Sequence, residues 1–105
     1  MKTIVAGSRE INDYKLVKRA CEASGFHITE VVCGCARGVD MLGKRWAEEN
    51  GIPVKEFHAP WDSLGAGAGP FRNRQMAEYA DALIAVHDGT SRGTANMIHE
   101  AKKRG

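Results

Sequence analysis

The chain has 105 residues, 43% of them hydrophobic and 27% charged, and its formal net charge is +2. This composition excludes a disordered chain, and because no apolar run approaches about 20 residues it excludes a membrane-spanning helix. A net charge this small supplies no electrostatic argument for nucleic-acid binding. From the length and the composition we expect one globular domain over residues 1–105 without a membrane partner.

The first third of the chain predicts a strand, a helix and a second strand. The β-branched run at 2–6 is typical of a short strand, and a Gly-Ser-Arg turn closes it. Asn12 or Asp13 can cap the helix that follows, and the Ser-Gly pair at 24–25 ends it. Residues 28–33 are again rich in β-branched side chains, which predicts the second strand.

The middle of the chain contains its clearest helical pattern. From Val39 to Ala47 apolar and small residues recur at helical spacing, and Trp46 belongs to this stripe, so we expect it in the core. An Asn-Gly-Ile-Pro segment at 50–53 stops the helix. Residues 53–58 alternate apolar and charged side chains, which predicts a half-exposed strand near a sheet edge.

The last part of the chain predicts one more helix-strand-helix unit. Residues 59–70 form a Gly- and Ala-rich loop without assignable structure, and 71–80 predict a helix. Residues 82–87 are apolar nearly throughout, which is typical of a buried central strand. A turn at 88–94 then leads into a final helix with Met97 on its inner side.

Alternating strands and helices predict a parallel sheet with helices on both faces, whose strands end on one ligand-binding rim. Glycine-bearing turns belong to this rim at 7–9, 34–38 and 88–94, and each leads into a helix. Helix N-termini and planar guanidinium groups both attract phosphate. The arginines of these turns are Arg9, Arg37 and Arg92. If they meet in one pocket, that pocket suits a phosphorylated ligand.

Several segments together resemble the small SLOG-type Rossmann proteins of the YspA (YpsA-related) kind. These segments are GSRE, GCARGVD, GPFRNRQMAEYADALIAVHDG and SRGTANMI. GCARGVD is also similar to the ARGID segment of the DNA-processing Smf/DprA proteins. The resemblance implies a Rossmann-like three-layer sandwich, with four parallel strands in the order 3-2-1-4 and a switch point beside Gly7 and Gly89. It also implies a nucleotide or nucleotide-derived ligand.

Residues 72–94 resemble the LOG (lysine-decarboxylase-like) phosphoribohydrolases, which split the base from ribose 5-phosphate. Arg72 matches the arginine before their third-helix methionine and would clamp the phosphate in such a hydrolase, whereas Met97 stands where their motif has a glutamate. A thioether cannot act as an acid or base. If this chain is such a hydrolase, Asp88 on the rim or Glu100, one helical turn beyond Met97, would supply the carboxylate.

Three functions remain open at this stage. The first is a sensor, carrier or sequestering module for a nucleotide-derived ligand, the second is N-glycosidic hydrolysis of a nucleoside 5′-monophosphate, and the third is single-stranded DNA binding of the Smf/DprA type. The residues expected to contact phosphate and ribose are Gly7, Ser8, Arg9, Gly34, Arg37, Gly38, Gly89, Ser91, Arg92, Gly93 and Thr94, with Arg72 and Asn73 closing over them.

The cysteine pattern and the chain ends bear on the redox state, metal binding and oligomeric state of the protein. With three cysteines and no secretory leader, we expect reduced thiols and a cytoplasmic protein. Cys33 and Cys35 lack a second pair at zinc spacing, so neither a metal nor a cofactor is expected. Related folds continue into a further strand, and a missing edge strand would favour a homodimer.

Overall fold

The computed structural model describes residues 1–36, 38–59, 61–86 and 92–103, without the side chains of residues 61, 66 and 92. The elements in chain order are β1 (Lys2–Gly7), α1 (Tyr14–Ala23), β2 (Glu30–Cys33), α2 (Val39–Glu49), β3 (Val54–Glu56), α3 (Trp61–Leu64), the 3-10 turn η1 (Gly65–Gly67), α4 (Ala68–Tyr79), β4 (Ala82–Val86) and α5 (Arg92–Lys103).

The strands form one parallel sheet in the order β3-β2-β1-β4. β1 is the long central strand: it pairs with β4 from Thr3 opposite Ala82 to Gly7 opposite Val86, and with β2 on its other side. The strand order therefore reverses at β1: the chain first adds β2 and β3 on one side of it, and the later crossover from β3 then adds β4 on the other side. The α/β class and the order 3-2-1-4 expected from the sequence are confirmed.

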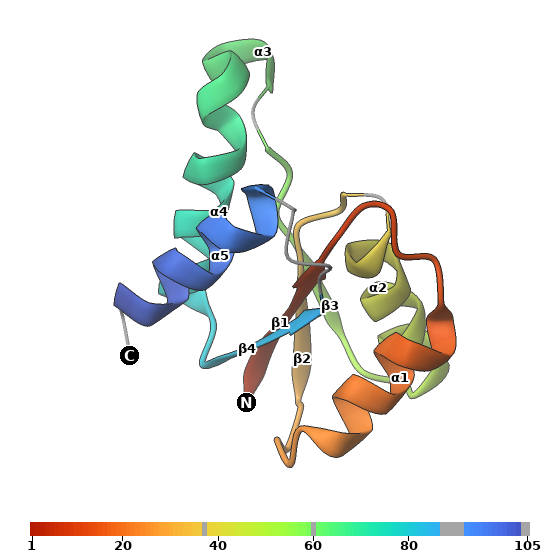
Figure 1. Cartoon of the computed structure of the whole chain (residues 1–105). Coiled ribbons are helices and arrows are strands. Elements are labelled where there is room, and N and C mark those ends of the chain that lie inside the picture. Colours follow the sequence, from red (N-terminus) through yellow and green to blue (C-terminus); the bar gives the residue numbers. More distant parts are fainter. Residues whose placement is uncertain (37, 60, 87–91, 104–105) are drawn as a thin grey trace.

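Two apolar cores lie on opposite faces of the sheet, and a pair of helices covers each face (Figure 1). Successive β1 side chains point to opposite faces, so Val5 belongs to one core while Ile4 and Ala6 belong to the other. α1 and α2 cover the Val5 face, where Trp46 is buried as expected. α4 and α5 cover the Ile4 face, where Met97 is 1% exposed. The result is the expected three-layer sandwich.

The expected loop at 59–70 is wrong, because most of it is helical. α3 and η1 occupy 61–67, and α4 begins at Ala68, three residues before the helix expected from 71. Ala68 is fully buried, so packing stabilises this first turn. Pro70 is tolerated in the turn because the first N–H groups of a helix have no partner within it. Gly and Pro thus start this helix rather than prevent it.

The expectation of a buried central strand at 82–87 is also wrong. β4 is an edge strand of the described sheet, and Ile84 is its only buried residue. Its apolar sequence reflects packing on both faces, not a position between two strands. The other differences are small: β2 begins at Glu30, two residues late, and β3 is limited to Val54–Glu56, a partly exposed edge strand as predicted.

The ends of two helices position the rim that follows. Asp13 caps α1, because its Oδ1 accepts hydrogen bonds from the N–H groups of Lys15 (3.1 Å) and Leu16 (3.4 Å). α5 begins at Arg92, which places Gly93 and Thr94 in its first turn rather than in the preceding loop. None of the helices in the described part of the chain combines the length and apolar character needed to cross a membrane.

Candidate functional site

A small pocket lies at the carboxyl end of β1, where the strand order reverses. Its volume is about 100 Å³, and residues from β1, the β2–α2 connection, α4 and α5 line it. These residues are Ala6, Gly7, Arg9, Ala36, Asp40, Arg72, Asn73, Met76, Gly93, Thr94 and Met97. We call this the rim pocket. Its place matches the crevice in which open parallel sheets bind ligands.

Two adjacent buried side chains of α4 connect the pocket walls. The Arg72 guanidinium donates through Nη1 to the Gly34 carbonyl and through Nε to Asn73 Oδ1 (3.0 Å). Asn73 Nδ2 in turn donates to the Gly93 carbonyl (3.1 Å) and to Asn96 Oδ1 (2.9 Å). A continuous network therefore joins the β2–α2 connection to the first turn of α5. It orients a guanidinium at the pocket before any ligand arrives.

Asp40 brings a buried carboxyl group to the same pocket from the first turn of α2. Its side chain is 5% exposed, and its Oδ2 accepts from the Ala36 N–H (3.4 Å). Burial raises the pKa of this carboxyl from 3.8 to about 6, although the charges of Arg72 and Arg9 and backbone N–H groups oppose the shift. A group that exchanges protons this close to neutrality can serve acid-base chemistry.

Two of the glycine-bearing turns fit together so closely that only glycine is accommodated. A Cβ at Gly7 would overlap the carbonyl oxygen of Val86 on β4. Gly38 has a φ of +79°, and a Cβ there would overlap the carbonyl oxygen of Ser8 and lie 2.7 Å from Arg9 Cα. The turn after β1 therefore lies directly against the start of α2. This contact brings Arg9 and Asp40 to one pocket.

The three arginines of the glycine turns are described to different extents. Arg9 is exposed and lines the rim pocket. Arg37 lies outside the described residues, as does the side chain of Arg92, although the backbone of Arg92 immediately precedes Gly93 at the pocket. The cationic groups that the structure brings together are thus Arg9 and Arg72.

The remaining expected site residues have varied locations. Ser8 is 2% exposed and does not line the pocket; its backbone hydrogen-bonds to Val86 and Val39. Gly34 lies against the Arg72 guanidinium and supplies its carbonyl acceptor. Asp88, Gly89 and Ser91 lie outside the described residues. Glu100 lines a different hollow of about 360 Å³, together with Leu64, Gly67, Pro70, Phe71 and Arg74.

Asp40 was not among the site residues expected from the sequence. The apolar lining residues Ala6, Ala36, Met76 and Met97 were not expected at the site either. The sequence does contain a pattern that could have identified Asp40. An acidic residue that follows a strand and a glycine turn falls in the first turn of a helix that begins at the ligand-binding rim. Ala36 belongs to the same turn, whereas the other three look like ordinary core residues in sequence.

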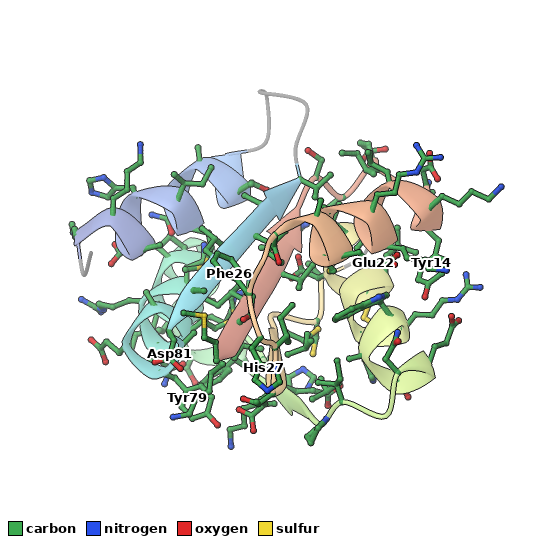
Figure 2. All side chains as sticks on the ribbon, turned by 90° about the horizontal axis from the view of Figure 1, so that it is seen from below. Tyr14, Glu22, Phe26, His27, Tyr79 and Asp81 are labelled. Carbon is green, nitrogen blue, oxygen red and sulfur yellow. The ribbon has the colours of Figure 1, made fainter. Side chains whose placement is uncertain are left out.

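A larger hollow of about 440 Å³ lies at the other end of the sheet, and Phe26, Leu83 and Asp81 are among its lining residues. Figure 2 shows Phe26, His27, Tyr79 and Asp81 around the amino ends of β1 and β4. Asp81 is engaged there with the backbone N–H of Lys2 (3.0 Å). Size alone therefore does not identify the ligand site, because this hollow lies away from the carboxyl rim.

Comparison with known proteins assigns the family. Residues 1–63 match the YspA, cpYpsA-related SLOG family, and this segment contains the first two glycine turns and Asp40. The chain belongs to that family. This SLOG protein is also similar to the Gene 61 protein of Mycobacterium phage D29, with 36% identity over an alignment 114 positions long that covers 99% of this chain and 90% of the phage protein. No solved structure matches it.

SLOG membership suggests nucleotide-related ligand binding in general. The family match ends before α4, so Arg72, Asn73 and the first turn of α5 lie beyond it. The similarity to the phage protein extends across both halves of the rim pocket.

Proposed function

We propose that this SLOG protein binds a phosphorylated, nucleotide-derived ligand in the rim pocket, as a sensor, carrier or sequestering module. The observation that carries the proposal is the meeting of Arg9, Arg72 and the first turn of α5 where the strand order reverses. α5 has 12 residues, so its N–H groups and dipole favour an anion at this end. Phosphate is the anion that such a combination suits.

The size of the pocket supports recognition of one end of the ligand. Its volume of about 100 Å³ is below the range of about 300–1,000 Å³ that is usual for whole small-molecule sites. The described walls are therefore suited to a phosphate with an adjoining sugar edge. In this arrangement the base would extend beyond them.

Asp40 favours a sugar phosphate over a bare inorganic anion. A carboxylate repels phosphate, yet it accepts hydrogen bonds well from ribose hydroxyl groups, as acidic residues do in dinucleotide-binding folds. With Arg9 and Arg72 on the same pocket, the site offers donors for phosphate and an acceptor for ribose. Binding of ribose 5-phosphate that is tighter than binding of inorganic phosphate is the expected consequence.

Thermal shift measurements with a ligand panel test this proposal. The panel contains inorganic phosphate, ribose 5-phosphate, nucleoside mono- and diphosphates and a single-stranded oligonucleotide. Sugar phosphates should raise the melting temperature because they bind the native state. Stabilisation by the oligonucleotide alone, lost at high salt, would instead favour DNA binding of the Smf/DprA type.

A matched pair of arginine variants locates the site. Arg9 is exposed, so Arg9→Ala should fold normally yet bind the sugar phosphate about 10- to 100-fold more weakly, as expected for a lost charged hydrogen bond. Arg19→Ala makes the same change on α1, away from the rim pocket. Equal affinities for the two variants would remove Arg9 from the site and contradict the proposal.

A second candidate function is hydrolysis of the N-glycosidic bond of a nucleoside 5′-monophosphate. The observation that favours it is the buried Asp40 carboxyl beside Arg72, because Asp40 could protonate the leaving base or activate the water. Water would add to C1′ as the C–N bond breaks, which yields the free base and ribose 5-phosphate. Arg72 would clamp the phosphate in this scheme.

Release of free base from nucleoside monophosphates, followed by chromatography, separates catalysis from binding. Under this scheme Asp40→Asn abolishes release, and Asp62→Asn, an exposed carboxylate on α3, leaves it unchanged. Release that depends on Glu100 and not on Asp40 would assign the carboxylate to the other hollow. If no base appears while ribose 5-phosphate still binds, the protein is a binding module.

A further inference from the structure

We propose that Cys35, Glu56 and His58 form a divalent-metal site for which zinc is the best fit. Each residue offers one ligand atom, and these sulfur, oxygen and nitrogen atoms all lie within 4.8 Å of one another. Cys35 is partly buried, whereas Glu56 and His58 are exposed, so an ion can enter from solvent. The site is separate from the proposed sugar-phosphate function and does not depend on it.

The sheet itself brings the three ligands together. β2 and β3 are parallel neighbours with Cys33 opposite Glu56, and the Phe57 N–H donates to the Cys33 carbonyl (2.8 Å). Glu56 and His58 flank Phe57, so their side chains emerge on the same side of the extended chain. The Phe57 ring packs against Tyr79 instead, with the ring centroids 5.5 Å apart.

Cys35 reaches this cluster through an unusual backbone conformation. Its φ of +61° is the only positive value of a non-glycine residue among those described. A non-glycine side chain in this left-handed region is strained, and such conformations concentrate at functional sites. Here the conformation sets the thiol near the two ligands from the neighbouring strand.

The donor set selects among metals. Thiolate and imidazole are ligands that zinc prefers, whereas magnesium and calcium take oxygen ligands. Three protein ligands leave one tetrahedral position open, which is the usual arrangement of zinc sites that hold water or a further ligand. The set therefore predicts zinc, with its fourth position accessible to solvent.

Lys44 of α2 holds the carboxylate in a suitable orientation. Its Nζ lies 2.8 Å from Glu56 Oε2, while the other oxygen, Oε1, lies 3.6 Å from His58 Nε2. One oxygen is thus engaged by an ammonium group and the other faces the remaining ligands. Ligating carboxylates are commonly hydrogen-bonded in this way, and such partners orient the ligand. The Lys44 charge is offset because thiolate and carboxylate together carry two negative charges.

Metal titration of the reduced, chelator-treated full-length chain tests the site. Zinc competed against a chromophoric chelator should bind with one ion per chain. Cobalt should add a thiolate-to-metal charge-transfer band, which reports directly on cysteine ligation. Absence of the band, or binding no tighter than to free histidine in the same buffer, would overturn the proposal.

Variants at the two exposed ligands test the site without disturbing the fold, because neither side chain is buried. His58→Ala and Glu56→Gln should each weaken zinc binding by at least about 100-fold, since even outer partners of metal ligands contribute about 10- to 100-fold. Cys35→Ser should abolish the cobalt band. His27→Ala is the matched control, an exposed histidine at the amino end of the sheet. If His27→Ala weakens binding as much as His58→Ala, the metal lies elsewhere and the assignment is wrong.

Discussion

Replacement of Asp40 by asparagine is expected to stabilise the protein at neutral pH. The carboxyl is 5% exposed, and burial raises its pKa to about 6. Asparagine has nearly the same shape and keeps an oxygen that can accept from the Ala36 N–H, but it carries no charge. The variant therefore removes the cost of a buried carboxylate and leaves the packing of α2 intact.

The magnitude follows from the two pKa values. The folded-state value of about 6 exceeds the ordinary value of 3.8. The native chain therefore binds this proton more tightly, and the associated stability is complete below about pH 3.8 and lost as the pH rises through about 6. At about 1.4 kcal/mol per pKa unit, ionisation of Asp40 costs the fold about 3 kcal/mol. Asp40→Asn should escape this cost above about pH 7.

Urea denaturation of the two proteins at several pH values measures the effect. The free energy of unfolding of Asp40→Asn minus that of the wild type should rise by about 3 kcal/mol between about pH 3 and pH 7, then stay constant. The subtraction cancels the titration of every other group. Asp62→Asn, an exposed change, should shift the free energy by less than about 0.5 kcal/mol. A difference for Asp40→Asn that is flat across this range would refute the reasoning.

Substitutions at three further positions test the contacts around the rim. Gly38→Ala should destabilise the fold by about 2 kcal/mol or more, because the φ of Gly38 is +79° and the new Cβ overlaps the Ser8 carbonyl. The urea midpoint measures this effect, and an unchanged midpoint would contradict the close contact between Gly38 and Ser8. Asp13→Ala should cost about 1 kcal/mol through loss of the α1 cap, whereas Asp13→Asn should retain most of it in the same assay. Met97→Ala should cost about 2–5 kcal/mol, because Met97 is 1% exposed in the core between the sheet and α5; a loss below about 1 kcal/mol would argue against that burial.

Local sequence patterns were sufficient to predict most of the elements. Asn12 and Asp13 were the two candidate helix caps, of which Asp13 is the cap, and Trp46 was expected in the core, because capping and apolar periodicity act over a few neighbouring residues. Glycine turns after strands located the rim, since parallel strands end on one side of a sheet. The same local reasoning failed at 59–70, where glycine and proline were interpreted as a loop although Ala68 is buried in a helix.

The composition of each site was decided by the tertiary structure. Asp40 and Arg72 lie 32 positions apart in sequence, yet both line the rim pocket, whereas Glu100 lines a different hollow. Cys35 meets His58 only because β2 and β3 pair in one register, which no short spacing motif encodes. Side chains from distant segments converge through strand order and helix packing. These long-range contacts arise from burial of the whole chain, so local sequence periodicity determines the elements but not which of their side chains meet.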